Sequence, residues 1–277
     1  MTVASEIFAP EALAGRVVLV TGGGTNLGRH AAKELHGAGA SVAIAGRRLE
    51  VLQEAAPQIG ERCAIAQGDI RDPDGARSII RAAIEAHGRL DVLVNNAGGQ
   101  YLVPAEDLAL KGFQAVWRLN VEGTLAMPRA AVEHGFGAEG GSVVNVTVSP
   151  HNGYPALAHT GAARAAVEAM TREQAAELAG RGIAVVAAAI GRFDTESLRK
   201  YPEIIWRGAA ATVPLQRLGT MDEFAWLIAL LASPLGRELS GSVVTLDGAL
   251  DDWDGAWPRP SMLDDSGVVP AEERRPG

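Results

Sequence analysis

The chain has 277 residues, of which 47% are hydrophobic and 21% charged, so it can bury a large core and is not a disordered chain. Acidic residues outnumber basic ones by 33 to 25, and the net charge of −8 argues against nucleic acid or an anionic membrane as partner. The single cysteine, Cys63, excludes an internal disulfide and a cysteine-based zinc site. No apolar run approaches the roughly 18 residues needed to cross a bilayer. We therefore expect a cytoplasmic protein that binds no metal.

Short β-branched runs alternate with longer alanine-rich stretches along most of the chain. We expect strands at Val17–Val20, Ser41–Ala45, Cys63–Ala66, Leu90–Val94, Ser142–Val146, Ile183–Ala189 and Ser242–Leu246. We expect helices at Leu27–Gly37, Leu49–Ala56, Pro73–His87, Gly112–Val132, Ala156–Ala179 and Asp222–Ala232. Several strands are apolar at every residue, as in a parallel sheet that is covered on both faces. The pattern predicts a single α/β domain over residues 1–250, a Rossmann-type doubly wound parallel sheet of about seven strands with helices on both faces. An irregular tail is expected over residues 251–277.

A glycine-rich run follows the first expected strand and opens the first expected helix. Such a turn lets backbone N–H groups and the positive end of the helix approach a pyrophosphate, although glycines also make ordinary tight turns. Its place after the first strand of a doubly wound sheet favours dinucleotide binding. Asn26 replaces the usual second glycine of the turn, and asparagine tolerates left-handed backbone better than other non-glycine residues. The residues assigned to the cofactor here are Gly22, Gly24, Thr25, Asn26, Leu27 and Gly28.

Two arginines stand where a dinucleotide-binding protein distinguishes NAD from NADP. A carboxylate for the ribose 2′-hydroxyl is expected about 20 residues after the turn, but Arg47 and Arg48 occupy that place. Two guanidinium groups suit a 2′-phosphate, so NADP(H) is favoured, with a solvated surface pair as the alternative. Asp69, followed by Ile70, ends the third expected strand and is placed to bind the adenine amino group. An ordinary turn aspartate is the alternative for Asp69.

Several motifs in order resemble the short-chain dehydrogenase/reductase family over roughly residues 14–250. They are the glycine-rich turn, Asn95-Asn96-Ala97-Gly98, Asn120 and the turn at Gly191. The segments 159–167 and 214–219 are most similar to trans-2-enoyl-CoA reductases and 2,4-dienoyl-CoA reductases of that family. The resemblance implies hydride transfer between a nicotinamide and a substrate carbon. It also implies a homodimer or homotetramer formed through helices 112–132 and 156–179. The further cofactor residues that it implies are Asn96, Ala97, Gly98, Arg164, Gly191 and Thr195.

The catalytic positions of the family are altered in this sequence. Family members generally use a tyrosine four residues before a lysine, and the alignment places Thr160 and Arg164 there. A threonine hydroxyl is too weak an acid to donate a proton alone, whereas arginine keeps the positive charge but does not titrate. The family's serine position falls on Val148, next to the hydroxyls of Thr147 and Ser149. The catalytic candidates are therefore Asn120, Ser149, Thr160, Arg164 and Tyr154, with His151 and His159 as further candidates.

Three functions remain open. The first is NADPH-dependent reduction of a conjugated carbonyl, with a trans-2-enoyl thioester as the preferred substrate. This reaction tolerates the missing tyrosine, because the enolate that it leaves needs positive charge more than a tyrosine acid. The second is a ketoreductase or alcohol dehydrogenase that uses a relocated donor such as Tyr154 or His159. The third is a redox-silent NADP(H)-binding protein. The stretch 193–211 is expected to form a substrate lid, and Trp253 and Trp257 to cover a pocket or brace another subunit.

Overall fold

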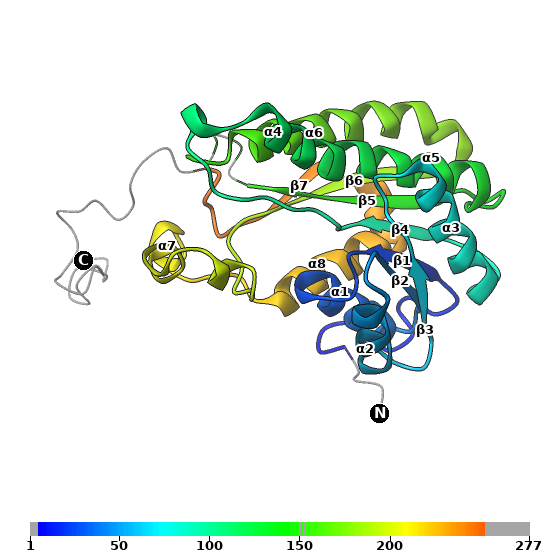
Figure 1. The fold of residues 1–277 in the computed structure, drawn as a ribbon. Coiled ribbons are helices and arrows are strands. Elements are labelled where there is room, and N and C mark those ends of the chain that lie inside the picture. The colour runs from blue at the N-terminus through cyan, green and yellow to red at the C-terminus, as the bar shows by residue number, and fades with distance from the viewer. Residues whose placement is uncertain (1–4, 150, 152, 154, 253–277) are drawn as a thin grey trace.

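Seven parallel strands form one twisted sheet in the order β3-β2-β1-β4-β5-β6-β7 (Figure 1). The computed structural model describes residues 5–149, 151, 153 and 155–252. The strands are β1 (Val17–Thr21), β2 (Ser41–Gly46), β3 (Cys63–Gln67), β4 (Val92–Asn95), β5 (Gly141–Val148), β6 (Ile183–Ile190) and β7 (Val243–Leu246). Each expected strand is present, and its bounds shift by no more than two residues at either end. The doubly wound parallel sheet predicted from the sequence is thus confirmed.

Helices cover both faces of the sheet, and the strand residues alternate between them. Val18 and Val20 of β1 face one core with α1 (Asn26–Gly37), α2 (Leu49–Ile59) and α8 (Met221–Ala232). Val17 and Leu19 face a second core with α3 (Pro73–His87), α5 (Gly123–His134) and α6 (Ala158–Leu178). The remaining described α-helices are α4 (Leu110–Trp117), which packs on α6, and α7 (Glu203–Gly208). Figure 1 shows the two helical layers on opposite sides of the strands.

The strand order reverses beside β1, which lies between β2 and β4. The chain runs outward through β1, β2 and β3, then returns to start the other half of the sheet at β4. The connection after β1 leads to one half of the sheet and the connection after β4 leads to the other half. The loops after β1 and β4 therefore separate and open a crevice at the carboxyl edge. The fold therefore places the glycine-rich turn and the Asn95-to-Gly98 loop at one site.

The prediction of a single α-helix at Gly112–Val132 is wrong. The segment instead contains α4, a π turn at Arg118–Glu122 (η2) and then α5. The Asn120 amide, inside the π turn and fully buried, donates to Val116 O at 2.9 Å and to Gly99 O at 2.8 Å. One extra residue in this turn changes the direction of the side chains that follow, and such turns often occur at functional sites. Hydrophobic periodicity does not register a single inserted residue.

Helix α8 begins with a capping box. Thr220 Oγ1 accepts from Glu223 N at 3.1 Å, and the Glu223 carboxylate accepts from Thr220 N at 2.8 Å. Removing the hydroxyl leaves a helix N–H without its acceptor, so Thr220→Ala is expected to lower the free energy of unfolding by about 1 kcal/mol. Denaturant unfolding measures this, with Thr220→Ser as the control that keeps the cap. An alanine variant as stable as the wild type would contradict the assignment.

The expected lid, 193–211, contains α7 and two short 3-10 turns. Ile204 is 84% exposed, and the guanidinium carbons of Arg199 and Arg207 lie 5.9 and 5.4 Å from the centroid of the Trp206 ring. In the described part of the chain, no helix is long and apolar enough to cross a membrane, and no group of three or more His, Cys, Asp or Glu side chains could hold a metal ion. The predictions for Tyr154, Trp253 and Trp257 fall outside the described residues.

Candidate active site

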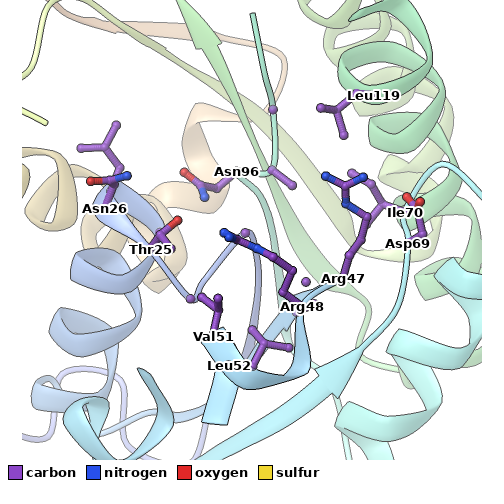
Figure 2. A pocket seen from close by; sticks show the side chains of 18 of the residues that line it. Thr25, Asn26, Arg47, Arg48, Val51, Leu52, Asp69, Ile70, Asn96 and Leu119 are labelled. Carbon is purple, nitrogen blue, oxygen red and sulfur yellow. The ribbon is translucent and has the colours of Figure 1, made fainter. Parts of the chain in front are cut away.

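A pocket of about 360 Å³ opens at the carboxyl edge of the sheet where the strand order reverses (Figure 2). The glycine-rich turn, the end of β2, the end of β3 and the loop after β4 form most of its wall. Every residue that the sequence assigned to the cofactor lines this pocket, except Arg164 and Gly191. The residues in common are Gly22, Gly24, Thr25, Asn26, Leu27, Gly28, Arg47, Arg48, Asp69, Ile70, Asn96, Ala97, Gly98 and Thr195.

The glycine-rich turn is shaped for close approach. Gly22 has a φ of +67°, and a Cβ atom at Gly28 would overlap the carbonyl oxygen of Gly22, so only glycine fits there. Asn26 has a φ of +43°, the left-handed conformation expected of it, and its amide donates to Ser197 Oγ at 3.3 Å. Among the described residues, no side-chain cap satisfies the N-terminus of α1 at Thr25. The first-turn N–H groups of this helix are therefore free to bind an anion.

Arg47 and Arg48 follow β2 with exposed side chains, and both line the pocket (Figure 2). Asp69 lies across from them, where Arg71 Nε donates to Asp69 Oδ1 at 2.9 Å and Arg71 Nη2 donates to Oδ2 at 2.5 Å. The hydrogen bonds from the Arg71 side chain lower the pKa of Asp69, so this carboxylate stays ionised. Arg47 and Arg48 thus line the pocket, and Arg71 engages the Asp69 carboxylate.

The loop after β4 is tied to the end of β1. Thr21 Oγ1 accepts from the backbone N of Asn96 and of Ala97, both at 3.0 Å, and the Asn96 amide donates to Thr21 O at 2.9 Å. These bonds hold Gly98 close to α6. A Cβ atom at Gly98 would overlap Nη2 of Arg164 and lie 2.8 Å from Oδ1 of Asn120. The glycine therefore brings the Arg164 guanidinium and the Asn120 amide to the pocket wall.

Arg164 is a buried cation behind that wall, 9% exposed. Its Nη1 donates to Val146 O at 2.7 Å, and within the described ranges its Nε has no hydrogen-bond partner. Burial lowers the pKa of Arg164 to about 10, against the opposing effect of the Glu168 charge. The group stays positive at neutral pH, which is unusual for a side chain this buried and indicates a place where negative charge is stabilised.

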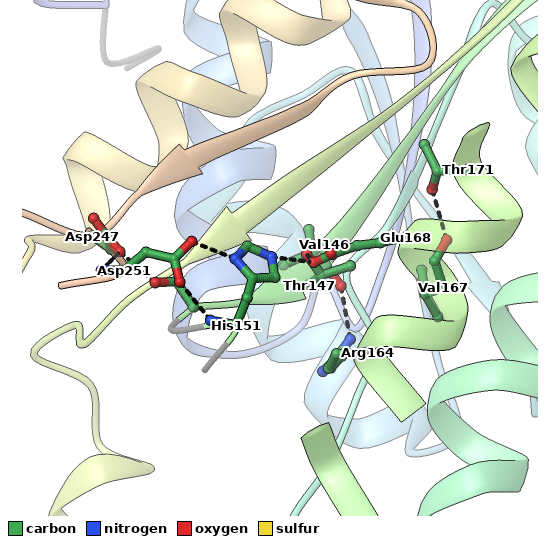
Figure 3. A network of polar contacts seen from close by, with 10 residues as sticks. Val146, Thr147, His151, Arg164, Val167, Glu168, Thr171, Asp247 and Asp251 are labelled. Carbon is green, nitrogen blue, oxygen red and sulfur yellow. Dashed lines mark hydrogen bonds and ion pairs between the residues drawn. The ribbon is translucent and has the colours of Figure 1, made fainter. Parts of the chain in front are cut away.

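A polar network around Glu168 and His151 lies near Arg164 and reaches the surface (Figure 3). Glu168 lies one helical turn after Arg164 and is 6% exposed. Its Oε1 accepts from Thr147 Oγ1 at 2.7 Å and lies 2.9 Å from His151 Nε2. The other ring nitrogen of His151, Nδ1, contacts Asp251 Oδ2. The sequence analysis named His151 and Thr147 but missed both carboxylates, although the four-residue spacing from Arg164 to Glu168 was a visible signal.

The other catalytic candidates separate in the structure. Ser149 donates to Asp247 Oδ2, and the backbone of Gly191 packs against the same aspartate. The Thr160 hydroxyl is buried, and the described chain offers it no hydrogen-bond partner. His159 is buried edge-on against the Tyr101 ring, with 4.6 Å between centroids. Thr160 and Arg164 do share one face of α6, as their spacing predicts, whereas Ser149 belongs to the turn beside β7.

Comparison with known proteins points to one enzyme family. The family model described as enoyl-(acyl carrier protein) reductase matches residues 23–250. The chain is similar to a peroxisomal 2,4-dienoyl-CoA reductase of Danio rerio, at 33% identity over 91% of this chain and 85% of that protein. It is also 33% identical to a probable 2,4-dienoyl-CoA reductase of Bacillus subtilis (strain 168), over 88% and 98% of the two chains.

Two solved structures extend the comparison. The citronellol catabolism dehydrogenase AtuB of Pseudomonas aeruginosa PAO1 has a TM-score of 0.80 at 34% identity and covers 90% of this chain and 100% of its own. The RhlG/NADP active-site complex of Pseudomonas aeruginosa has a TM-score of 0.80 at 30% identity, over 88% and 100%. The family resemblance drawn from the sequence is confirmed: this chain belongs to the short-chain dehydrogenase/reductase family of oxidoreductases.

Proposed function

We propose that the chain is an NADP(H)-dependent reductase of a conjugated thioester, a trans-2-enoyl or 2,4-dienoyl thioester. One observation carries the proposal. The Arg164 guanidinium is buried beside the Asn120 amide at the pocket wall, and the tyrosine position of the family holds Thr160. The site thus provides fixed positive charge, with a threonine in place of the phenolic acid that the family generally uses.

The pocket residues fit a phosphorylated dinucleotide. The uncapped N-terminus of α1 and the tight approach at Gly28 suit a pyrophosphate, and Arg47 and Arg48 suit a 2′-phosphate. Arg164 and Asn120 lie against Gly98 at the pocket wall, and Arg164 would hold the nicotinamide ribose there. When bound, the cofactor supplies a hydride to the substrate. Arg164 Nε is a buried donor that has no acceptor among the described residues, and a ribose hydroxyl would provide one.

The charge arrangement favours reduction of an alkene over reduction of a ketone. Addition of hydride to the β carbon of an enoyl thioester leaves an enolate, whose negative charge rests on the thioester oxygen. Arg164 would stabilise that negative charge, an interaction of the oxyanion-hole type, whereas the two N–H groups of Asn120 already donate to Val116 O and Gly99 O. Reduction of a ketone instead needs an acid that protonates an alkoxide at once, and the Thr160 hydroxyl is too weak for that. The similarity to proteins named 2,4-dienoyl-CoA reductases supports the same choice.

A spectrophotometric assay tests the proposal. Purified protein with NADPH is expected to consume the cofactor when given enoyl-CoA or 2,4-dienoyl-CoA thioesters across a range of chain lengths, and to leave a matched panel of ketones unreduced. Turnover of ketones alone would favour the ketoreductase alternative. Saturable NADPH binding with no turnover on either panel would favour a redox-silent protein.

We also propose a homo-oligomer in the cytoplasm. The exposed side chains of Leu110, on α4, and Leu125, on α5, support association because both lie on the helical layer expected to form the interface. Their exposed fractions are 70% and 45%.

A further inference from the structure

We propose that His151 stores the proton that completes the reduction and passes it inward through Glu168. This inference rests on the proposed function, because it assigns the proton source for the enolate that thioester reduction leaves. His151 acts through Glu168, so it is a relay residue and need not touch the substrate.

The first support is the geometry of the histidine. His151 comes directly after β5 at the carboxyl edge of the sheet, the edge that carries the pocket. Its Nε2 lies 2.9 Å from Glu168 Oε1, and its Nδ1 contacts Asp251 Oδ2. Its backbone N donates to Asp251 Oδ1 as well. The ring is therefore fixed between one carboxylate from α6 and one from the turn after β7 (Figure 3).

The second support is proton accounting. A neutral imidazole has one N–H and one lone pair, so it can donate to only one of two carboxylates. The other ring nitrogen would then face an oxygen lone pair at hydrogen-bond distance. Both contacts are satisfied when the Glu168, His151 and Asp251 set holds one more proton than three ordinary side chains would at neutral pH. Burial alone lowers the pKa of His151, but hydrogen bonds to Asp251 and Glu168 outweigh it, and the net direction is upward.

The third support is the path. The His151 side chain is 37% exposed, whereas the Glu168 side chain is only 7% exposed, so the pair connects solvent to the interior. Glu168 lies one helical turn from Arg164, whose guanidinium reaches Gly98 at the pocket wall. Asp251 is itself held by Asp247, which accepts from Asp251 N at 2.8 Å. The charged groups that face the histidine are therefore Glu168 and Asp251, with Arg164 and Asp247 directly behind them.

The bound cofactor would supply the hydride of the first new C–H bond, and the electron pair of the alkene would move onto the thioester enolate. The Nε2–H bond of His151 breaks as Glu168 Oε1 takes the proton. Glu168 then gives a proton to the enolate carbon, which forms the second C–H bond and regenerates the thioester. Solvent reprotonates His151 at its exposed edge. No further oxidant or reductant is needed.

The variant His151→Gln keeps a hydrogen-bonding side chain but does not titrate, so kcat is expected to fall about 100-fold at neutral pH. In the wild type, kcat should fall as pH rises through the raised pKa of His151, because the stored proton is lost there. That limb should vanish in His151→Gln and move to lower pH in Asp251→Asn. NADPH affinity, measured by fluorescence titration, should stay within about 3-fold of wild type in both variants, since neither residue lines the pocket.

Two measurements keep the outcomes apart. Proton NMR of the protein without cofactor should show the His151 ring titrating above the ordinary pKa of histidine, about 6.5, and lower in Asp251→Asn. The control His134→Gln removes an exposed histidine beside Glu133 and should change neither kcat nor its pH profile. Wild-type protein without thioester turnover would overturn the proposed function and the relay together. Turnover with unchanged kcat and pH profile in His151→Gln would overturn the relay alone, as would an NMR titration at or below the ordinary value.

Discussion

Replacement of Arg164 by methionine is expected to lower kcat on an enoyl thioester by a factor of about 10² to 10³. Methionine fills similar space without charge, so the developing enolate would lose its buried cation, and removal of one oxyanion-hole donor has an effect of this size. The buried Glu168 carboxylate would lose one of its positive neighbours at the same time. Steady-state kinetics and NADPH titration together measure the change.

Two further variants test whether the lost kcat comes from the lost charge. Arg164→Lys restores a positive charge at the position where the family generally has lysine, so it should recover most of the lost kcat. Arg172→Met removes an exposed arginine from the same helix, α6, and should leave kcat unchanged. Equal activity of Arg164→Met and wild type would show that the buried charge has no part in the reaction. A fall in the arginine control as large as that of Arg164→Met would point to damage to the helix instead.

The sheet and the pocket could be predicted from the sequence because their signals are local. Runs such as Ile183–Ile190 are apolar at every residue and rich in β-branched side chains, which is typical of a strand covered on both faces. The glycine-rich turn carries its own steric requirement, since Gly28 leaves no space for a side chain. The order of strands and helices then fixes which turns meet at the carboxyl edge. All of this follows from short stretches of chain read one at a time.

The His151 network could not be predicted in the same way. His151 and Asp251 are 100 residues apart, and only the pairing of β5 with β6 and of β6 with β7 brings their turns together. Asp251 depends in turn on the bend that Asp247 stabilises. Sequence reasoning examined hydroxyls near the family's serine and tyrosine positions, whereas the structure gathers carboxylates around a histidine. The π turn at Asn120 was missed for a related reason, because one inserted residue barely alters hydrophobic periodicity.

The double variant Arg47→Ala/Arg48→Ala is expected to weaken NADPH binding by about 100-fold or more and to leave NADH binding within about 3-fold. Each charge-assisted hydrogen bond to the 2′-phosphate contributes on the order of 1.5–3 kcal/mol, and NADH has no group there to lose. The fold should tolerate the change. Both side chains are exposed. The Arg48 side chain makes no cap hydrogen bond to α2 in the described structure, and Arg47 accepts from Gln67 through its backbone carbonyl, which alanine keeps.

Fluorescence titration with both nucleotides measures the selectivity directly, and the ratio of the two dissociation constants removes any general loss of folded protein. Arg129→Ala provides the control, because this arginine is exposed on α5 and pairs only with Glu133 among the described contacts. A double variant that retained its preference for NADPH would overturn the assignment of Arg47 and Arg48. Arg71 would then be the remaining guanidinium at that end of the pocket, although its engagement by Asp69 leaves it fewer free N–H groups for a phosphate. Equal losses of NADPH and NADH would instead place the two arginines on the pyrophosphate, which both nucleotides share.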